Sequence, residues 1–209
     1  AGFAPYEFYE NGEVIGVDIE ISKKIADKLG KKLVIKDVAF DSIINELNSG
    51  KADFAAAGMS INPERSEKVD FSIEYITSNQ VVVVKKDSDI KSIDDIKDKR
   101  ISVQLGTVAD TYVTKNYKDA KINRLKKFLV AAEDVKNNKS DCIVMDAIPA
   151  NELVKSNPEL KVLDGILFQD KYGMAVKKGN KELLNSINLV LEELIKDGKI
   201  DEYIIKFSE

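Results

Sequence analysis

The sequence predicts an α/β protein of two lobes, each a mostly parallel sheet flanked by helices, joined by a two-strand hinge. Three observations support this prediction. Short apolar segments alternate with amphipathic segments, an order typical of parallel sheets covered by helices. The same order of segments occurs twice within the 209 residues. Polar extended segments border the second repeat, where two strands that cross between lobes make a hinge.

The first repeat begins with a helix. Its predicted elements are a helix over 18–29, a strand over 33–35, a short helix over 41–48 and a strand over 54–57. Asp18 is the expected N-cap of the first helix, and Gly30 is its expected stop. The last strand consists of apolar residues only, so we expect it to be buried.

The second repeat has a matching register. Its predicted elements are a strand over 101–103, a helix ending near 117, a strand near 122, a helix over 131–136 and a strand over 142–145. A phenylalanine lies thirteen residues before Asp53 and before Asp141, and each aspartate opens an apolar strand. Five residues further on, Gly58 and Asp146 should occupy equivalent strand ends. Strand ends of this kind are where open α/β sheets bind ligands.

The end of the chain shows how the lobes are divided. A last helix over 182–195, with Gly198 as its stop, has no counterpart in the repeat. A discontinuous first lobe explains this helix. We therefore expect lobe 1 to comprise residues 1–77 and 171–209, and lobe 2 to comprise residues 78–170.

Composition excludes several classes of function. Lys and Arg number 32 against 36 Asp and Glu, and the two signs are mixed along the chain, so we expect no nucleic-acid partner. There is no histidine, which removes the Ser-His-Asp and Cys-His catalytic arrangements and the commonest metal ligand. We expect no catalytic residue, no metal and no cofactor.

The apolar segments carry two further expectations. Cys142 is the only cysteine and lies in an apolar run, so it is predicted to be a buried core thiol and not a nucleophile. The longest apolar stretches fall far short of the roughly 18 residues that span a bilayer. No signal peptide precedes Ala1, and we expect a soluble chain from which any export signal has been removed.

A candidate anion site follows the apolar strand of the first repeat. The chain turns there from Gly58 through Ser60 to Pro63, a favoured first residue of a helix, and then reaches Arg65. Backbone N–H groups, the Ser60 hydroxyl and the planar guanidinium of Arg65 suit a carboxylate. The alternative is that Arg65 is a solvated surface residue.

Lobe 2 offers two further candidates at its strand ends. Thr107, in the turn after the first strand, can donate to the same carboxylate, or it can be a plain helix cap. Asp146 ends the last strand, where its carboxylate can hold an ammonium group. The alternative is an N-cap for the helix near Pro149, and both roles can coexist.

The whole chain resembles the bacterial extracellular solute-binding proteins of family 3, the receptors of polar amino-acid ABC importers. The motifs that carry the resemblance are Phe3-Ala4-Pro5-Tyr6-Glu7-Phe8 with Gly16-Val17-Asp18, the stretch 57–72 with Pro63-Glu64-Arg65 at its centre, Gly106-Thr107, the stretch 140–146, and the stretch 177–180. The resemblance implies the two-lobed type II periplasmic-binding-protein fold. It also implies that a free amino acid binds in the cleft between the lobes and is delivered to a membrane permease.

The same resemblance assigns the binding residues. Arg65 is expected to bind the ligand carboxylate together with Ser60, Thr107 and Val108. Asp146 is expected to bind the amino group together with Gly58 and Ser60. The positions expected to line the side-chain pocket are Phe3, Phe40, Met59, Gln104 and Met145. For the two phenylalanines, core packing is the alternative.

The resemblance further implies a monomer outside the cytoplasm, either periplasmic or lipid-anchored at the outer face of the membrane. Two other functions use the same scaffold: a ligand-sensing domain of a membrane receptor and a dehydratase. The lack of histidine and of a second catalytic acid argues against the dehydratase.

Two departures from the family pattern stand out. Family members begin with a strand before the Phe3 segment, which should be central in lobe 1. Asn138-Lys139 replaces a usual glycine in a turn. The pocket positions carry no second net charge, so the sequence favours a ligand with a neutral side chain, unless Glu7 turns inward or a preceding residue supplies the charge.

Overall fold

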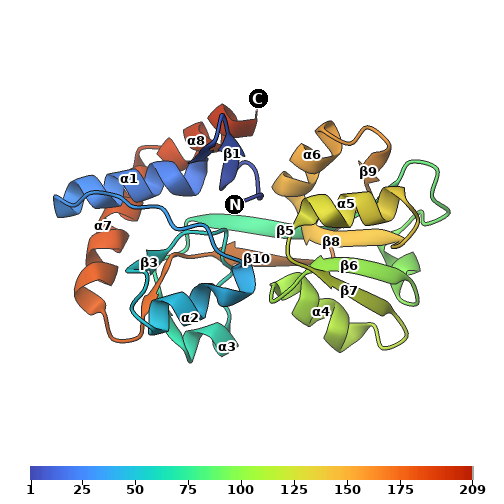
Figure 1. The fold of residues 1–209 in the computed structure, drawn as a ribbon, viewed down its shortest axis with the longest axis horizontal. Coiled ribbons are helices and arrows are strands. Elements are labelled where there is room, and N and C mark those ends of the chain that lie inside the picture. Colours follow the sequence, from blue (N-terminus) through green and yellow to red (C-terminus); the bar gives the residue numbers. More distant parts are fainter. Residues whose placement is uncertain (209) are drawn as a thin grey trace. The chain divides into compact units, whose positions relative to one another are not determined.

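In a computed structural model of the chain, which describes residues 1–208, the backbone forms two compact α/β units (Figure 1). Unit 1 comprises Phe3–Thr77 and the chain from Lys171 onward, and unit 2 comprises Ser78–Asp170. The chain passes from unit 1 to unit 2 within strand β5 (Ile76–Lys85) and returns within strand β10 (Phe168–Tyr172).

Unit 1 contains a three-stranded sheet in the order β3-β11-β4 and a separate hairpin of β1 and β2. Its elements are β1 (Phe8–Glu10), β2 (Glu13–Ile15), α1 (Val17–Leu29), a 3-10 turn (Phe40–Ser42), α2 (Ile43–Asn48), β3 (Phe54–Ala55), α3 (Pro63–Ser66), β4 (Val69–Phe71), β11 (Ala175–Lys177), α7 (Lys181–Lys196) and α8 (Lys199–Ser208). Strand β11 runs antiparallel to both of its neighbours, so β3 and β4 point the same way. The adjacent strand pairs of this sheet are therefore antiparallel, unlike the mostly parallel pairing that was predicted.

Unit 2 is built on the sheet β10-β5-β8-β6-β7, with β9 also paired to β5. Its remaining elements are a 3-10 turn (Ile93–Ile96), β6 (Arg100–Gln104), α4 (Val108–Asn116), β7 (Lys121–Leu125), α5 (Phe128–Lys136), β8 (Cys142–Asp146), α6 (Ala147–Lys155) and β9 (Leu160–Val162). β6 runs parallel to β7 and to β8, whereas β5 is antiparallel to β8. This sheet brings the carboxyl ends of β6 and β8 to one edge.

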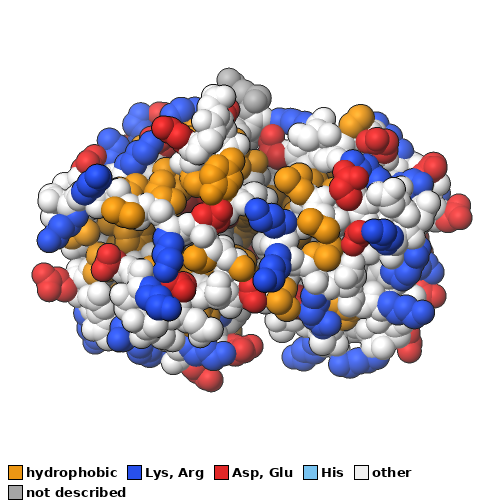
Figure 2. Space-filling view, in the orientation of Figure 1, with side chains coloured by type: hydrophobic (Ala, Val, Ile, Leu, Met, Phe, Trp, Pro, Cys, Tyr) orange, Lys and Arg blue, Asp and Glu red, His pale blue; other side chains and the backbone are white. Residues whose placement is uncertain are grey.

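The hydrophobic cores follow from strand alternation. In unit 2, Val82, Val103 and Val144 share one face and pack with Ala109 and Val113 of α4. Cys142 lies in the same core, and burial raises the pKa of its thiol, as expected of a core cysteine. In the view of Figure 2, basic and acidic side chains are intermixed over the surface of each unit.

Three predictions about elements are wrong. Residues 31–39 form no strand, and Val34 and Ile35 are exposed, because no described strand pairs with this segment. The helix predicted over 182–195 ends before Gly198 as expected, but it is not the last helix, because α8 follows Gly198. Asp18 is not an N-cap but lies inside the first turn of α1.

Helix α1 begins directly after Gly16, its N-cap residue, because backbone carbonyls accept from its first N–H groups. The N–H groups of Val17 and Asp18 donate to the carbonyls of Pro5 and Tyr6, both at 3.0 Å. Gly16 has a φ of 130°, and a Cβ at this position would lie 2.2 Å from the Tyr6 carbonyl oxygen. Only glycine fits this close approach.

We predict that Gly16→Ala lowers the free energy of unfolding by at least about 2 kcal/mol, because it adds a clash to an unfavourable φ. Gly30→Ala is the matched control. Gly30 caps the other end of α1 at a φ of 61°, but no atom lies within 4 Å of its ideal Cβ. Gly30→Ala should therefore lower the free energy of unfolding by only about 1 kcal/mol. Urea denaturation measures both, and equal losses would contradict the steric argument.

Candidate functional site

In unit 1, the turn after β3 is held by a buried carboxylate. The Gly58 N–H donates to Asp18 Oδ2 at 2.8 Å, and the Tyr75 hydroxyl donates to Asp18 Oδ1 at 2.7 Å. Asp18 is completely buried. Burial raises the pKa of Asp18 to about 6, and the two hydrogen bonds oppose this rise because they stabilise the ionised form.

Gly58 also allows an aromatic ring to approach the turn. Its φ is 50°, and a Cβ there would lie 2.7 Å from a ring carbon of Phe3. The Phe3 ring in turn lies 5.6 Å from that of Tyr6. Phe3 therefore both packs against the core of unit 1 and borders the Gly58 turn.

The next residues of the turn are fastened to the chain that returns from unit 2. The Ile61 N–H donates to the Lys171 carbonyl at 2.8 Å, and the Gly173 N–H donates to the Met59 carbonyl at 3.0 Å. Ser60 forms a β-bridge with Tyr172. The side chain of Met59 is buried in the core beneath the turn.

Arg65 lies in the short helix α3, with its guanidinium directed back onto the turn. Asn62 caps the helix, accepting from the Arg65 N–H at 2.8 Å. Arg65 Nη1 donates to the Ser60 carbonyl at 2.6 Å, and its guanidinium carbon lies 5.3 Å from the Phe40 ring centroid. Arg65 is only 7% exposed, so it is not a solvated surface residue.

In unit 2, the turn after β6 contains the second group of candidates. Thr107 caps helix α4: its hydroxyl accepts from the Asp110 N–H at 3.2 Å and donates to the Gln104 carbonyl at 2.8 Å. The predicted plain helix cap is therefore present at Thr107. Val108 is the first residue of α4, and the Gln104 amide donates to the Lys126 carbonyl at 3.0 Å.

The ion pair of Asp110 and Arg124 supports the turn after β6. Asp110 Oδ2 accepts from the Gly106 N–H at 3.2 Å, and its Oδ1 accepts from Arg124 Nε at 2.8 Å. The Thr114 hydroxyl lies 3.2 Å from the same Oδ1. Asp110 is almost fully buried, so these bonds fix the turn strongly.

Asp146 stands at the end of β8, adjacent to the turn after β6 in the parallel sheet. Its backbone is in the N-cap position of α6, but its side chain makes no capping hydrogen bond. Instead, Oδ1 accepts from the Ser78 hydroxyl and from Gln80 Nε2, both at 2.7 Å. Gln80 Nε2 also lies 3.4 Å from Asp170 Oδ1. An ionised carboxylate can accept about four hydrogen bonds, and its charge suits a cationic partner such as an ammonium group.

The candidate residues thus fall into one group in each unit. Unit 1 brings together Phe3, Phe40, Gly58, Ser60 and Arg65, which offer a buried cation and aromatic rings. Unit 2 brings Thr107, Val108 and Asp146 to one sheet edge, with Gln104 at the end of β6. Met145, which directly precedes Asp146 in β8, is buried, as is Met59.

Sequence reasoning missed the residues that support the site, namely Asp18, Tyr75, Ser78, Gln80 and Asp110. The sequence does contain a pattern that could have identified Ser78 and Gln80. They are polar residues next to the apolar run Val81–Val84, and Gln80 lies on a strand directly opposite Asp146. Their alternation places both side chains on the face that carries the Asp146 side chain.

Comparisons with known proteins give the chain a family. The sequence profile of the bacterial extracellular solute-binding proteins, family 3, matches residues 1–209. The chain belongs to this family. The family 3 chain is 34% identical to the ABC transporter arginine-binding protein 1 of Escherichia coli (strain K12), over 95% of its own length and 84% of that protein.

Solved structures agree with this assignment. An ancestral arginine-binding protein bound to arginine is 43% identical to the family 3 chain, with a TM-score of 0.92 over 98% of this chain and 93% of that chain. An ancestral arginine-binding protein bound to glutamine is 42% identical, with a TM-score of 0.93, over 99% of this chain and 94% of that chain. The predicted family and the two-lobed type II fold are confirmed. In the described part of the family 3 chain, no helix is both long enough and apolar enough to cross a membrane.

We predict that Asp110→Ala speeds hydrogen exchange of the Gly106 amide by about tenfold or more, because a hydrogen bond to a charged group contributes about 1.5 to 3 kcal/mol. Amide exchange measured by NMR tests this.

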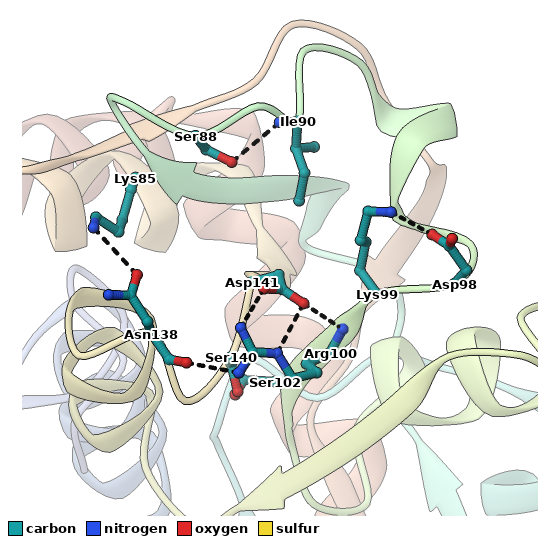
Figure 3. Close-up of polar contacts among 10 residues, drawn as sticks. All are labelled: Lys85, Ser88, Ile90, Asp98, Lys99, Arg100, Ser102, Asn138, Ser140 and Asp141. Atoms are coloured by element: carbon teal, nitrogen blue, oxygen red, sulfur yellow. Dashed lines mark hydrogen bonds and ion pairs between the residues drawn. The ribbon is translucent and has the colours of Figure 1, made fainter.

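Asp141→Ala is the matched control. Asp141 also pairs with an arginine and accepts from a backbone N–H, but at Arg100, the start of β6 (Figure 3). Asp141→Ala should speed hydrogen exchange of the Arg100 amide and leave the exchange rate of the Gly106 amide unchanged. Exchange at Gly106 that rises equally in both variants would mean that Asp110 has no local role.

Proposed function

We propose that this chain binds one free amino acid, with Arg65 as the main partner of its carboxylate and Asp146 as the main partner of its ammonium group, and delivers it to the permease of an ABC importer. The observation that carries the proposal is the buried guanidinium of Arg65. The names of the relatives and the amino acids bound in the similar solved structures support it.

Arg65 is suited to the ligand carboxylate by its fixed orientation. Its backbone is held by Asn62 and its head by the Ser60 carbonyl and the Phe40 ring. A guanidinium has five N–H donors in a planar fork, a geometry that matches both oxygens of a carboxylate. Because the group is already ordered and largely desolvated, binding costs little further entropy. Thr107 and Val108, at the start of α4, supply additional donors in the proposal.

Asp146 is the proposed partner of the ammonium group. Ser78 and Gln80 orient its carboxylate from one side through Oδ1. In unit 1 the Gly58 N–H is engaged by Asp18, so Gly58 can contribute its carbonyl oxygen to the ammonium group, and Ser60 its hydroxyl. Phe3 and Phe40 would then flank the ligand side chain, with Gln104 as a neutral polar contact.

Arginine is the proposed ligand, in place of the neutral side chain that the sequence favoured. The E. coli relative and the ancestral protein are named as arginine-binding. Glu7 supports a cationic side chain, since it forms a β-bridge with Phe3 and is half-buried. Its negative charge is one of the causes that raise the pKa of Tyr75, after burial and the interaction with Asp18. Glutamine is the second candidate, because it occupies a similar solved structure.

The proposed setting of this function follows from the family. The chain would act as a monomer outside the cytoplasmic membrane, periplasmic or lipid-anchored, and would hand the amino acid over unchanged. It would perform no catalysis, in line with relatives that are named as binding proteins and with a sequence that has no histidine.

We predict that Arg65→Ala weakens arginine binding by roughly two to four decades, because removing one partner of a buried charge pair costs about 3 to 5 kcal/mol. Arg65→Lys should also bind poorly, since an ammonium cannot bond both carboxylate oxygens in one plane. Arg100→Ala, which removes an exposed arginine from unit 2, is the control. Calorimetric titration that finds either Arg65 variant within about threefold of wild type would refute the carboxylate assignment.

We predict that Asp146→Asn weakens binding of L-arginine far more than binding of 5-guanidinopentanoic acid, which has no α-amino group. The asparagine still accepts hydrogen bonds from Ser78 and Gln80, but it carries no charge for an ammonium group. Asp141→Asn should affect neither ligand. Equal losses for both ligands in Asp146→Asn would show that Asp146 is structural.

A further inference from the structure

The buried carboxylate of Asp18 connects the proposed binding turn with both crossings of the chain. Through its two oxygens it joins the Gly58 N–H to the hydroxyl of Tyr75, the residue directly before β5. The same turn is bonded to the returning segment at Lys171 and Gly173. The Tyr75 N–H closes this arrangement by donating to the Tyr172 carbonyl at 3.1 Å.

We propose that Asp18 is a positioning residue for amino-acid binding: its ionised carboxylate holds the Gly58 turn in the geometry that receives the ligand, and its protonation weakens binding. The inference rests on the proposed function. Asp18 itself does not contact the ligand in this account, because both of its oxygens are engaged by protein donors.

Protonation of Asp18 would change both of its bonds. A carboxylate accepts from Gly58 and Tyr75 with charge assistance, whereas a carboxylic acid has one neutral acceptor and one O–H donor. The bond to Gly58 becomes weaker, and Tyr75 must reverse its role from donor to acceptor. The negative charge that favours the ligand ammonium in the neighbourhood of the Gly58 carbonyl is also lost.

This protonation falls within an accessible pH range. Burial raises the pKa of Asp18 to about 6. The titratable groups whose charges act on the Asp18–Tyr75 pair are Glu7 and Tyr6, both in the segment before β1. Because ligand binding favours ionised Asp18, affinity should be highest above pH 6 and fall as the pH drops through 6. One unit below the pKa, the loss should reach about tenfold.

The test is the dissociation constant of L-arginine, measured by calorimetry between pH 5.0 and 7.5. Wild type should bind about tenfold more weakly at pH 5.0 than at pH 7.5. Asp18→Asn has the hydrogen-bonding pattern of the protonated acid, so it should bind at the weak level at every pH. Tyr75→Phe removes a bond that favours the ionised form, so the midpoint of the affinity loss should move to higher pH. This second variant keeps the test valid if Asp18→Asn does not fold.

Glu7→Gln identifies the titrating group. This variant can lower the affinity for arginine, but its pH dependence should persist. Wild-type affinity that does not change with pH, a pH dependence that persists in Asp18→Asn, or an unmoved midpoint in Tyr75→Phe would overturn the role of Asp18 while leaving amino-acid binding intact. If wild type binds no amino acid at any pH, the proposed function and this inference both fail.

Discussion

The buried Asp18 carboxylate must be satisfied by protein donors, and this requirement constrains the arrangement of unit 1. A buried charge is tolerated only when donors surround it, and the donors here come from the turn after β3 and from the segment before β5. The turn is thereby placed where Phe3 packs on Gly58 and where the Ser60 carbonyl accepts from Arg65. One interaction in the interior thus orients the group that we assign to the ligand carboxylate.

Unit 2 also contains buried carboxylates, Asp110 and Asp146, but their hydrogen-bond partners differ from those of Asp18. Asp110, also nearly buried, accepts from the Gly106 N–H in the turn after β6, but it is balanced by Arg124. Asp146 accepts from the hydroxyl of Ser78 and the amide of Gln80. The ion pair with Arg124 reduces the negative potential of Asp110. We therefore assign the ligand ammonium to Asp146 and a supporting role to Asp110.

The sequence predicted those features that depend on local pattern. The strand ending at Asp146, the turn with Arg65 and the Gly30 stop of α1 follow from periodicity and from glycine and proline chemistry. The prediction of a strand over 33–35 is wrong because strand formation requires hydrogen bonds to a neighbouring strand, and the sequence of one segment does not specify such a neighbour. Asp18 was misassigned because carbonyls distant in sequence already cap α1. Met59 and Met145 are both buried, and their expected places in the side-chain pocket stay a prediction.

Thermal unfolding in the presence of each standard amino acid and cystine tests the central claim most directly. A ligand at about 100 times its dissociation constant adds roughly 2.7 kcal/mol to the free energy of unfolding, which raises the Tm of a domain of this size by about 5 to 10 °C. The account predicts a rise of this size with L-arginine and a smaller or absent rise with most other amino acids. If none of these amino acids raises the Tm at millimolar concentration, the claim that the chain binds a free amino acid is contradicted.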